Sequence, residues 1–259
     1  MVLGYLASLL IGLSLGLLGS GGSILTLPVL VYLFQVDAEV GTAYSLVIVG
    51  TTALVGVLPR ALKGEVDFRT ALLFGLPSIA AVYATRAWLM PILPDQWGPV
   101  TKSQGLMLLF AVLMVLAARG MIKGKKAQTV KKELSPAAKA AVVLGEGAGV
   151  GILTGLVGAG GGFLIIPVLV LVTGLEMKRA VGTSLLIIAA KSLIGFTGDL
   201  GHLNPDWSFL GRVALVSSIG LAVGTFVAQK IPSQKLQKGF GYFVLIMGIF
   251  VLTKELFFN

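Results

Sequence analysis

The sequence contains no cysteine, a single histidine and few charged residues. The absence of cysteine excludes disulfide bonds and thiol chemistry, and it leaves the redox compartment undetermined. Charged residues make up 12% of the 259 residues, apolar residues make up 56%, and the mean hydropathy is +0.97. A water-soluble domain of this length does not need so much apolar surface for its core. The composition therefore indicates an integral membrane protein, and we expect neither a cofactor nor a metal site.

Long apolar runs recur along the chain, for instance at residues 71–89, 105–118, 181–197 and 239–252. A helix needs about 20 residues to cross the roughly 30 Å of hydrocarbon in a bilayer. These runs predict transmembrane helices, and the fold class they indicate is an all-α polytopic membrane protein.

Two stretches of the chain repeat one another. The segment GLSLGLLGSGGSILTLPVLV begins at Gly12, and GILTGLVGAGGGFLIIPVLV begins at Gly151, an offset of 139 residues. The correspondence continues without a gap to Asp67 and Asp206. Each copy interrupts an apolar segment with a glycine cluster that is followed by a proline. Broken helices at matching positions of two halves are the sequence pattern of a secondary-transporter binding site.

Basic residues are concentrated in one long polar connection between the copies. We expect a first transmembrane repeat over residues 1–119, a linker over 120–137 and a second repeat over 138–259. A basic loop beside membrane spans is typical of the cytoplasmic side, and we favour this over binding of nucleic acid or lipid headgroups despite the formal net charge of +9. The basic residues in and beside the linker are Arg119, Lys123, Lys125, Lys126, Lys131, Lys132 and Lys139.

The charges of the other loops predict that the two repeats have opposite orientations. With the linker inside, the loop at residues 60–69 lies inside and carries three basic residues, while the loop at 36–40 lies outside and its only charges are acidic. In the second copy, the loop at 175–180 lies inside, and the loop at 199–207 lies outside without lysine or arginine. Both copies obey the positive-inside rule. We therefore expect two inverted-topology repeats, each with a glycine-broken helical hairpin plus about three transmembrane helices.

The glycine clusters at residues 19–23 and 158–162 are predicted to break their helices inside the membrane. The segment at 24–35 has 12 residues, about 18 Å of helix, which is too short for a full span. Two such hairpins from opposite faces would bring the clusters together, and unpaired N–H groups at a helix start favour an anion. We assign Gly12, Gly16, Gly151 and Gly155 to helix packing instead. The residues of the clusters expected to bind substrate are Ser20, Gly21, Gly22, Ser23, Gly160, Gly161 and Gly162.

Charged residues within the spans are few. Lys191 lies near the middle of its span, where an ammonium is costly unless it is paired, so we expect it to bind an anionic substrate or a counter-ion. Glu146 is the obvious protein partner for Lys191, and it is equally a candidate proton carrier for coupling. Arg86 lies close to the outer end of its helix, where we expect its side chain to snorkel to the interface.

Hydroxyl side chains recur at corresponding places in both copies. A single serine or threonine in a membrane helix often only bonds back to the preceding turn. Their recurrence at the start of two corresponding helices favours substrate binding by Ser45, Thr183 and Ser184. We interpret His202 as a solvated residue of an outer loop.

The duplicated pattern G-x3-G-x2-G-x-GG-x5-P and the Gly182-Thr183-Ser184-Leu185 segment resemble the sulfite exporter TauE/SafE family. The resemblance extends to the C-terminal segment from Ala228-Gln229-Lys230-Ile231-Pro232 to Phe240 and Met247, so it covers essentially the whole chain. It implies a bacterial or archaeal inner-membrane permease for anions such as sulfite, sulfonates or sulfoacetate. The chain departs from the family pattern at Lys191, where a neutral polar residue is expected, and at Glu146, where an apolar or small one is expected.

The leading hypothesis is therefore an inner-membrane secondary transporter that moves small sulfur-containing anions by alternating access. Its expected partners are the anion, the lipid bilayer and a coupling ion such as a proton. An anion channel is the alternative within transport. An intramembrane serine hydrolase that uses Ser20 is a weaker alternative, because the only histidine is in an outer loop.

Overall fold

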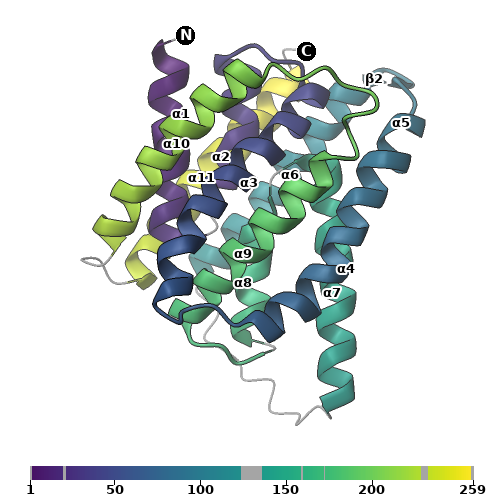
Figure 1. Ribbon diagram of the computed structural model, residues 1–259. Coiled ribbons are helices and arrows are strands. Elements are labelled where there is room, and N and C mark those ends of the chain that lie inside the picture. The colour runs from purple at the N-terminus through teal and green to yellow at the C-terminus, as the bar shows by residue number, and fades with distance from the viewer. Residues whose placement is uncertain are drawn as a thin grey trace.

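The computed structural model describes residues 2–19, 22–123, 136–158, 160–171, 173–228 and 233–257. The described part is nearly all helical, as predicted (Figure 1). The elements before the linker are α1 (Val2–Leu18), α2 (Ser23–Pro28), η1 (Val29–Leu33), α3 (Ala38–Leu62), α4 (Phe68–Ala84), η2 (Thr85–Leu89), α5 (Met90–Ile92), the short hairpin of β1 (Gln96–Trp97) and β2 (Val100–Thr101), and α6 (Lys102–Lys123). The elements after it are α7 (Pro136–Val157), α8 (Gly162–Leu171), α9 (Met177–Phe196), α10 (Trp207–Ala228) and α11 (Ser233–Phe257).

Six helical segments within the described ranges are long and apolar enough to cross a membrane. The chain is therefore a multi-pass membrane protein, and each apolar run named in the sequence coincides with a helix. Among the six, α3 and α9 are the most enclosed, with 78% and 72% of their apolar windows buried against 33–39% for the others. The helices α3 and α9 thus form the centre of the molecule. The six segments are Ala38–Leu62, Phe68–Ile92, Lys102–Lys123, Ala140–Val157, Met177–Phe196 and Trp207–Ala228.

The predicted half-length segments after the glycine clusters are present. The helix Ser23–Leu33, formed by α2 and η1, and the ten-residue α8 are both too short to span a bilayer. The first of them folds back along α1, because Phe34 packs edge-on against Tyr5 with ring centroids 5.4 Å apart. α1 and α2 therefore form the hairpin that the broken pattern predicted.

The helices pair across the two halves of the chain. α1 packs against α10, and α7 packs against α4. By the offset of 139 residues, α1 corresponds to α7, and α4 and α10 begin directly after the corresponding Asp67 and Asp206. Two further pairings join helices that hold the same place in the two halves, α3 with α9 and α6 with α11, and α4 packs against α9 as α10 packs against α3. The large contacts between the described helices of the two halves are thus made twice, or lie between equivalents.

Glycines permit the closest of these approaches. A Cβ atom at Gly12 would lie 1.6 Å from the carbonyl oxygen of Ser217 on α10, and one at Gly151 would lie 2.5 Å from the carbonyl oxygen of Ser78 on α4. Gly151 and Ser217 follow Gly12 and Ser78 by the same 139 residues. Both glycines therefore serve helix packing, as predicted. The same holds for the other two glycines assigned to packing, Gly16 and Gly155.

Candidate functional site

The first glycine break lies between the end of α1 and the start of α2. Gly19 has a left-handed φ of 70°, which ends α1, and Gly22 precedes the first residue of α2. Gly22 and Ser23 are both buried, as residues that line an interior site must be. The predicted site residues Ser20 and Gly21 lie outside the described residues.

The second break lies between the end of α7 and the start of α8 at Gly162. Gly160 and Gly161 have φ values of 60° and 62°, which side chains adopt only with strain. A Cβ atom at Gly161 would lie 2.4 Å from the hydroxyl of Thr154 and 2.8 Å from the ammonium of Lys191. Glycine is therefore required here both by the backbone conformation and by the approach of these two polar groups.

The two breaks meet in the middle of the molecule. A Cβ atom at Gly160 would lie 3.2 Å from Cβ of Ser23, 2.7 Å from Val49 on α3 and 3.5 Å from Ile188 on α9. The second break thus reaches the start of α2, and both breaks lie against the central helices.

Lys191 is fully buried on α9, and its ammonium donates a hydrogen bond of 3.0 Å to the hydroxyl of Thr154. Glu146, the predicted protein partner, lies on α7 with its side chain exposed and forms no ion pair with Lys191. A buried cation without a carboxylate beside it is costly, and a bound anion would offset that cost.

The three predicted hydroxyl residues have different surroundings. Ser45 is fully buried on α3, and its hydroxyl has no hydrogen-bond partner among the described residues. Ser184, its equivalent on α9, donates to the carbonyl of Val181 at 2.9 Å and lies 3.4 Å from the carbonyl of Gly19. Ser184 therefore reaches the first break.

Thr183 is used differently. Its hydroxyl accepts a hydrogen bond of 2.9 Å from the backbone N–H of Asp67 at the start of α4. The corresponding position of the first half holds Tyr44, whose hydroxyl accepts a hydrogen bond of 2.9 Å from the N–H of Asp206 at the start of α10. The same hydrogen bond between the halves is thus made twice. The hydroxyl of Thr183 therefore has a structural partner, and no substrate is needed to account for its presence.

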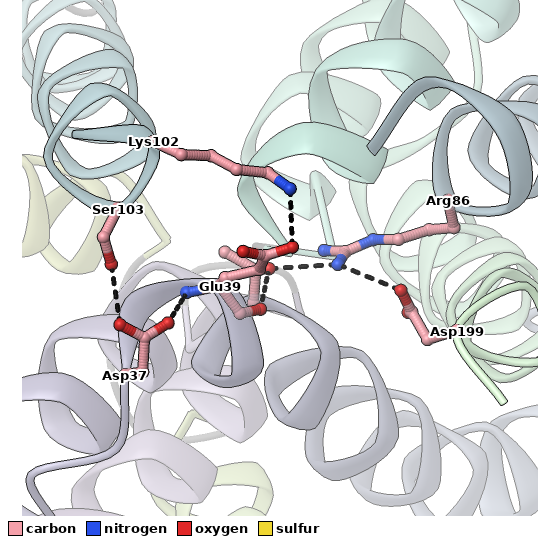
Figure 2. A network of polar contacts seen from close by, with 7 residues as sticks. Asp37, Glu39, Arg86, Lys102, Ser103 and Asp199 are labelled. Carbon is pink, nitrogen blue, oxygen red and sulfur yellow. Dashed lines mark hydrogen bonds and ion pairs between the residues drawn. The ribbon is translucent and has the colours of Figure 1, made fainter. Parts of the chain in front are cut away.

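The prediction that Arg86 snorkels to the membrane interface is wrong. Its side chain is 1% exposed, and its Nη1 atom donates to the hydroxyl of Thr42 at 3.0 Å and lies 3.5 Å from a carboxylate oxygen of Asp199 (Figure 2). The turn after α9 packs against η2 at Gly198. This packing places the carboxylate of Asp199 beside the guanidinium of Arg86. By contrast, His202 is exposed after α9, as expected of a loop residue.

Sequence reasoning missed two residues that contact the predicted ones. Thr154 was overlooked because a threonine in an apolar helix is common, although the first copy has Leu15 at the corresponding position. Thr42 was overlooked for the same reason. One feature of the sequence could have indicated both residues. Each is a threonine on a helix that packs closely against the other half of the chain at a glycine.

A cavity of about 570 Å³ lies apart from the glycine breaks, where η1, the start of α3 and the start of α6 meet. Its wall includes Asp37 and Ser103, whose side chains are hydrogen-bonded to one another at 3.0 Å. The cavity adjoins the polar network of Figure 2, which continues through Glu39 and Thr42 to Arg86.

The family model described as "Sulfite exporter TauE/SafE" matches residues 4–251. A "Probable membrane transporter protein" of Xylella fastidiosa (strain 9a5c) is 30% identical over 256 residues, which cover 95% of this chain and 92% of the relative. The "Probable membrane transporter protein YdhB" of Bacillus subtilis (strain 168) is 26% identical over 249 residues, covering 95% and 98%. No solved structure matches the chain.

Proposed function

Because the chain belongs to the sulfite exporter TauE/SafE family, we propose that it is a secondary transporter of small sulfur-containing anions such as sulfite or sulfonates. The relatives are named as membrane transporters, which favours transport over catalysis. The observation that carries the proposal is the ammonium of Lys191, which is fully buried beside the second break and forms no ion pair with a carboxylate of the described residues.

The proposed binding site lies where the two breaks meet. Lys191 supplies the charge, and its position next to Thr154 and Gly161 lets an anion replace the missing carboxylate. Hydroxyl groups complete the site from both halves, and backbone N–H groups at the helix starts add further donors. We leave Thr183 out of the site because its hydroxyl serves Asp67. The hydroxyl residues of the proposed site are Ser20, Ser23, Ser45, Thr154 and Ser184, and its glycines are Gly21, Gly22, Gly160, Gly161 and Gly162.

We further propose that the two halves are inverted repeats and that they expose the site alternately to the two sides. The reciprocal contacts support this proposal, because corresponding helices and hydrogen-bonding groups of each half contact the other half in the same way. A pair of equivalent halves around one site is the arrangement that alternating access uses. We keep Glu146 as the candidate for proton coupling, because it is a carboxylate carried by a membrane helix.

The transport test uses purified protein in liposomes with radiolabelled sulfite. A carrier should give saturable uptake that accelerates when unlabelled sulfite is present on the opposite side. A channel would give flux without this counterflow. Absence of any flux of sulfite, sulfoacetate or methanesulfonate would contradict the proposed function.

The topology test uses single cysteines, which the cysteine-free chain allows without prior engineering. A cysteine at Asn204 should react with an impermeant thiol reagent added to intact cells. A cysteine at Lys63, in the exposed turn after α3, should react only after permeabilisation. Labelling of both from outside would rule out the inverted arrangement.

A further inference from the structure

Arg86 has the largest fully buried side chain within the described ranges. It lies in η2, a π-helical turn that interrupts the helix between α4 and α5. Such turns are rare and frequently occur at functional sites. The guanidinium is therefore held at an irregular point of the backbone, at the end of α4 that adjoins the turn after α9.

Only part of the guanidinium is paired. Nη1 makes both contacts, to Thr42 and Asp199, whereas Nε and Nη2 have no hydrogen-bond partner within the described part of the chain. These two nitrogen atoms form one side of the planar group, with parallel N–H donors. That side matches two oxygen atoms of a carboxylate, phosphate or sulfonate, which it binds through paired hydrogen bonds.

The position of Arg86 relates it to the central site. Its partner Thr42 lies against Gly158, where a Cβ atom would be 2.1 Å from the carbonyl oxygen of Thr42. The neighbouring Thr85 packs against Gly155 in the last turn of α7. That same turn carries Thr154, the partner of Lys191. The two buried cations therefore lie beside one turn of α7, and an anion passing this turn meets both.

Asp199 is a weakly held counter-ion. Its Oδ1 atom lies 3.5 Å from Nη1 of Arg86, a longer distance than the 2.7 Å between Lys102 and Glu39 in the same network (Figure 2). Its Oδ2 atom is buried and has no hydrogen-bond partner among the described residues. Burial raises the pKa of Asp199, while the charge of Arg86 acts in the opposite direction. The carboxylate thus neutralises Arg86 without occupying its open side.

We propose that Arg86 forms a second anion site on the outer side of the central one, where its Nε and Nη2 atoms bind two oxygens of a sulfite, sulfonate or carboxylate group. Asp199 competes electrostatically with that anion and weakens its binding, so the anion is released onward to Lys191 or outward. This proposal rests on the proposed transport function, because it places the second site along the same path. A purely structural Arg86 would only neutralise Asp199.

The test measures binding of sulfite to the full-length protein in detergent, by calorimetric titration, in the background of Lys191→Met. Removing the central charge isolates the second site. The Lys191→Met protein should still bind sulfite, and adding Arg86→Lys, which keeps the charge but loses the paired donors, should weaken binding by about tenfold. Adding Asp199→Asn instead should tighten binding by about tenfold, because the competing charge is gone. Arg212→Lys, at an exposed arginine of α10, is the matched control and should change nothing.

The outcomes separate the two proposals. Loss of all sulfite binding in Lys191→Met, or binding that is indifferent to both Arg86→Lys and Asp199→Asn, would overturn the Arg86 site and leave the central site standing. Sulfite binding that depends on Arg86 but not on Lys191, together with no sulfite flux in liposomes, would retain the Arg86 site and overturn the proposed function. If Arg86→Lys does not fold, as judged by its thermal melt, the Asp199→Asn arm decides, and unchanged or weaker binding counts against the site.

Discussion

At the second glycine break, the ammonium of Lys191 bonds to Thr154, whereas the corresponding positions of the first break hold Thr52 and Leu15. The hydroxyl of Thr52 donates to the carbonyl of Ile48 in its own helix at 2.6 Å, and Leu15 is fully buried. Thr52 and Leu15 therefore provide neither the charge nor the bond between helices that Lys191 and Thr154 provide. The two breaks have the same place in the fold and different chemistry.

The described glycines of the two breaks also differ in backbone conformation. They begin alike, since Gly19 and Gly158 have φ values of 70° and 69°. Three residues later they differ, because Gly22 is right-handed with φ −65° and Gly161 is left-handed with φ 62°. The backbone changes hand at the glycine that faces Lys191. The two halves thus share their packing contacts, while Lys191 gives the second break a buried cation that the corresponding Thr52 does not supply.

The largest expected effect comes from filling the second break. Gly161→Leu places a side chain on the hydroxyl of Thr154 and the ammonium of Lys191, and it strains a left-handed residue by about 1–2 kcal/mol. Sulfite flux in liposomes should fall to background while the protein still reaches the membrane. Gly174→Leu is the matched control, because Gly174 has a φ of 75° but no atom within 4 Å of its added Cβ. If the two variants transport equally, the second break does not face the path.

The next effect comes from removing the charge that distinguishes the breaks. Lys191→Met keeps most of the side-chain volume, so sulfite affinity should fall by about 10–100-fold, more than stability falls. Thr52→Val, the equivalent change at the first break, removes a hydroxyl that bonds only within α3 and should leave affinity nearly unchanged. Binding titrations and thermal melts of both variants measure the difference. Equal losses in the two variants would mean that the breaks are functionally equivalent.

Glu146 provides an independent check on Lys191. Because the carboxylate is exposed and unpaired with Lys191, Glu146→Gln should not restore folding or sulfite affinity to Lys191→Met. The effects of the two substitutions should add in a double-mutant cycle. Recovery in the double mutant would instead assign Lys191 to the neutralisation of Glu146.

Much of the helical arrangement could be predicted from the sequence, for physical reasons. Membrane helices can be recognised in a sequence by their length and hydropathy, and a duplication indicates which elements of the two halves correspond. The packing role of Gly12 and Gly151 followed from their spacing, and the short length of Ser23–Leu33 followed from the glycines and the proline around it. These features depend on local composition, which the sequence displays directly.

The polar contacts were less predictable, because they depend on which side of a helix faces which neighbour. Arg86 near a helix end was expected to snorkel, and only the packing of η2 against the turn after α9 shows that its side chain is enclosed. Glu146 was expected inside, but it lies on the exposed side of α7. Thr183 looked equivalent to a site residue, and its use by Asp67 appears only when the two halves are brought together.

A smaller effect is expected from the hydroxyl that positions Lys191. Thr154→Val keeps the shape of the side chain and removes the acceptor of the 3.0 Å hydrogen bond, so sulfite affinity should fall by about three- to tenfold. Thr253→Val, on α11, is the matched control. The exposed hydroxyl of Thr253 donates to a carbonyl of its own helix, as the hydroxyl of Thr154 does. An unchanged affinity in Thr154→Val would show that Lys191 reaches its functional position without this contact.

The smallest effect concerns the frame that the two halves share. Tyr44→Phe and Thr183→Val each remove one of the reciprocal hydrogen bonds to Asp206 and Asp67, so each should lower the free energy of unfolding by about 1 kcal/mol.

Because the two bonds are equivalent, the two losses should be similar, in contrast to the unequal effects expected at Lys191 and Thr52. Neither variant should change the sulfite concentration that gives half-maximal flux, since both hydroxyls serve helix starts rather than the breaks. Denaturation curves and flux measurements on the same preparations test both statements. A selective loss of sulfite affinity in Thr183→Val alone would return Thr183 to the binding site. The chemical difference between the halves would then extend from the breaks to the first turns of α3 and α9.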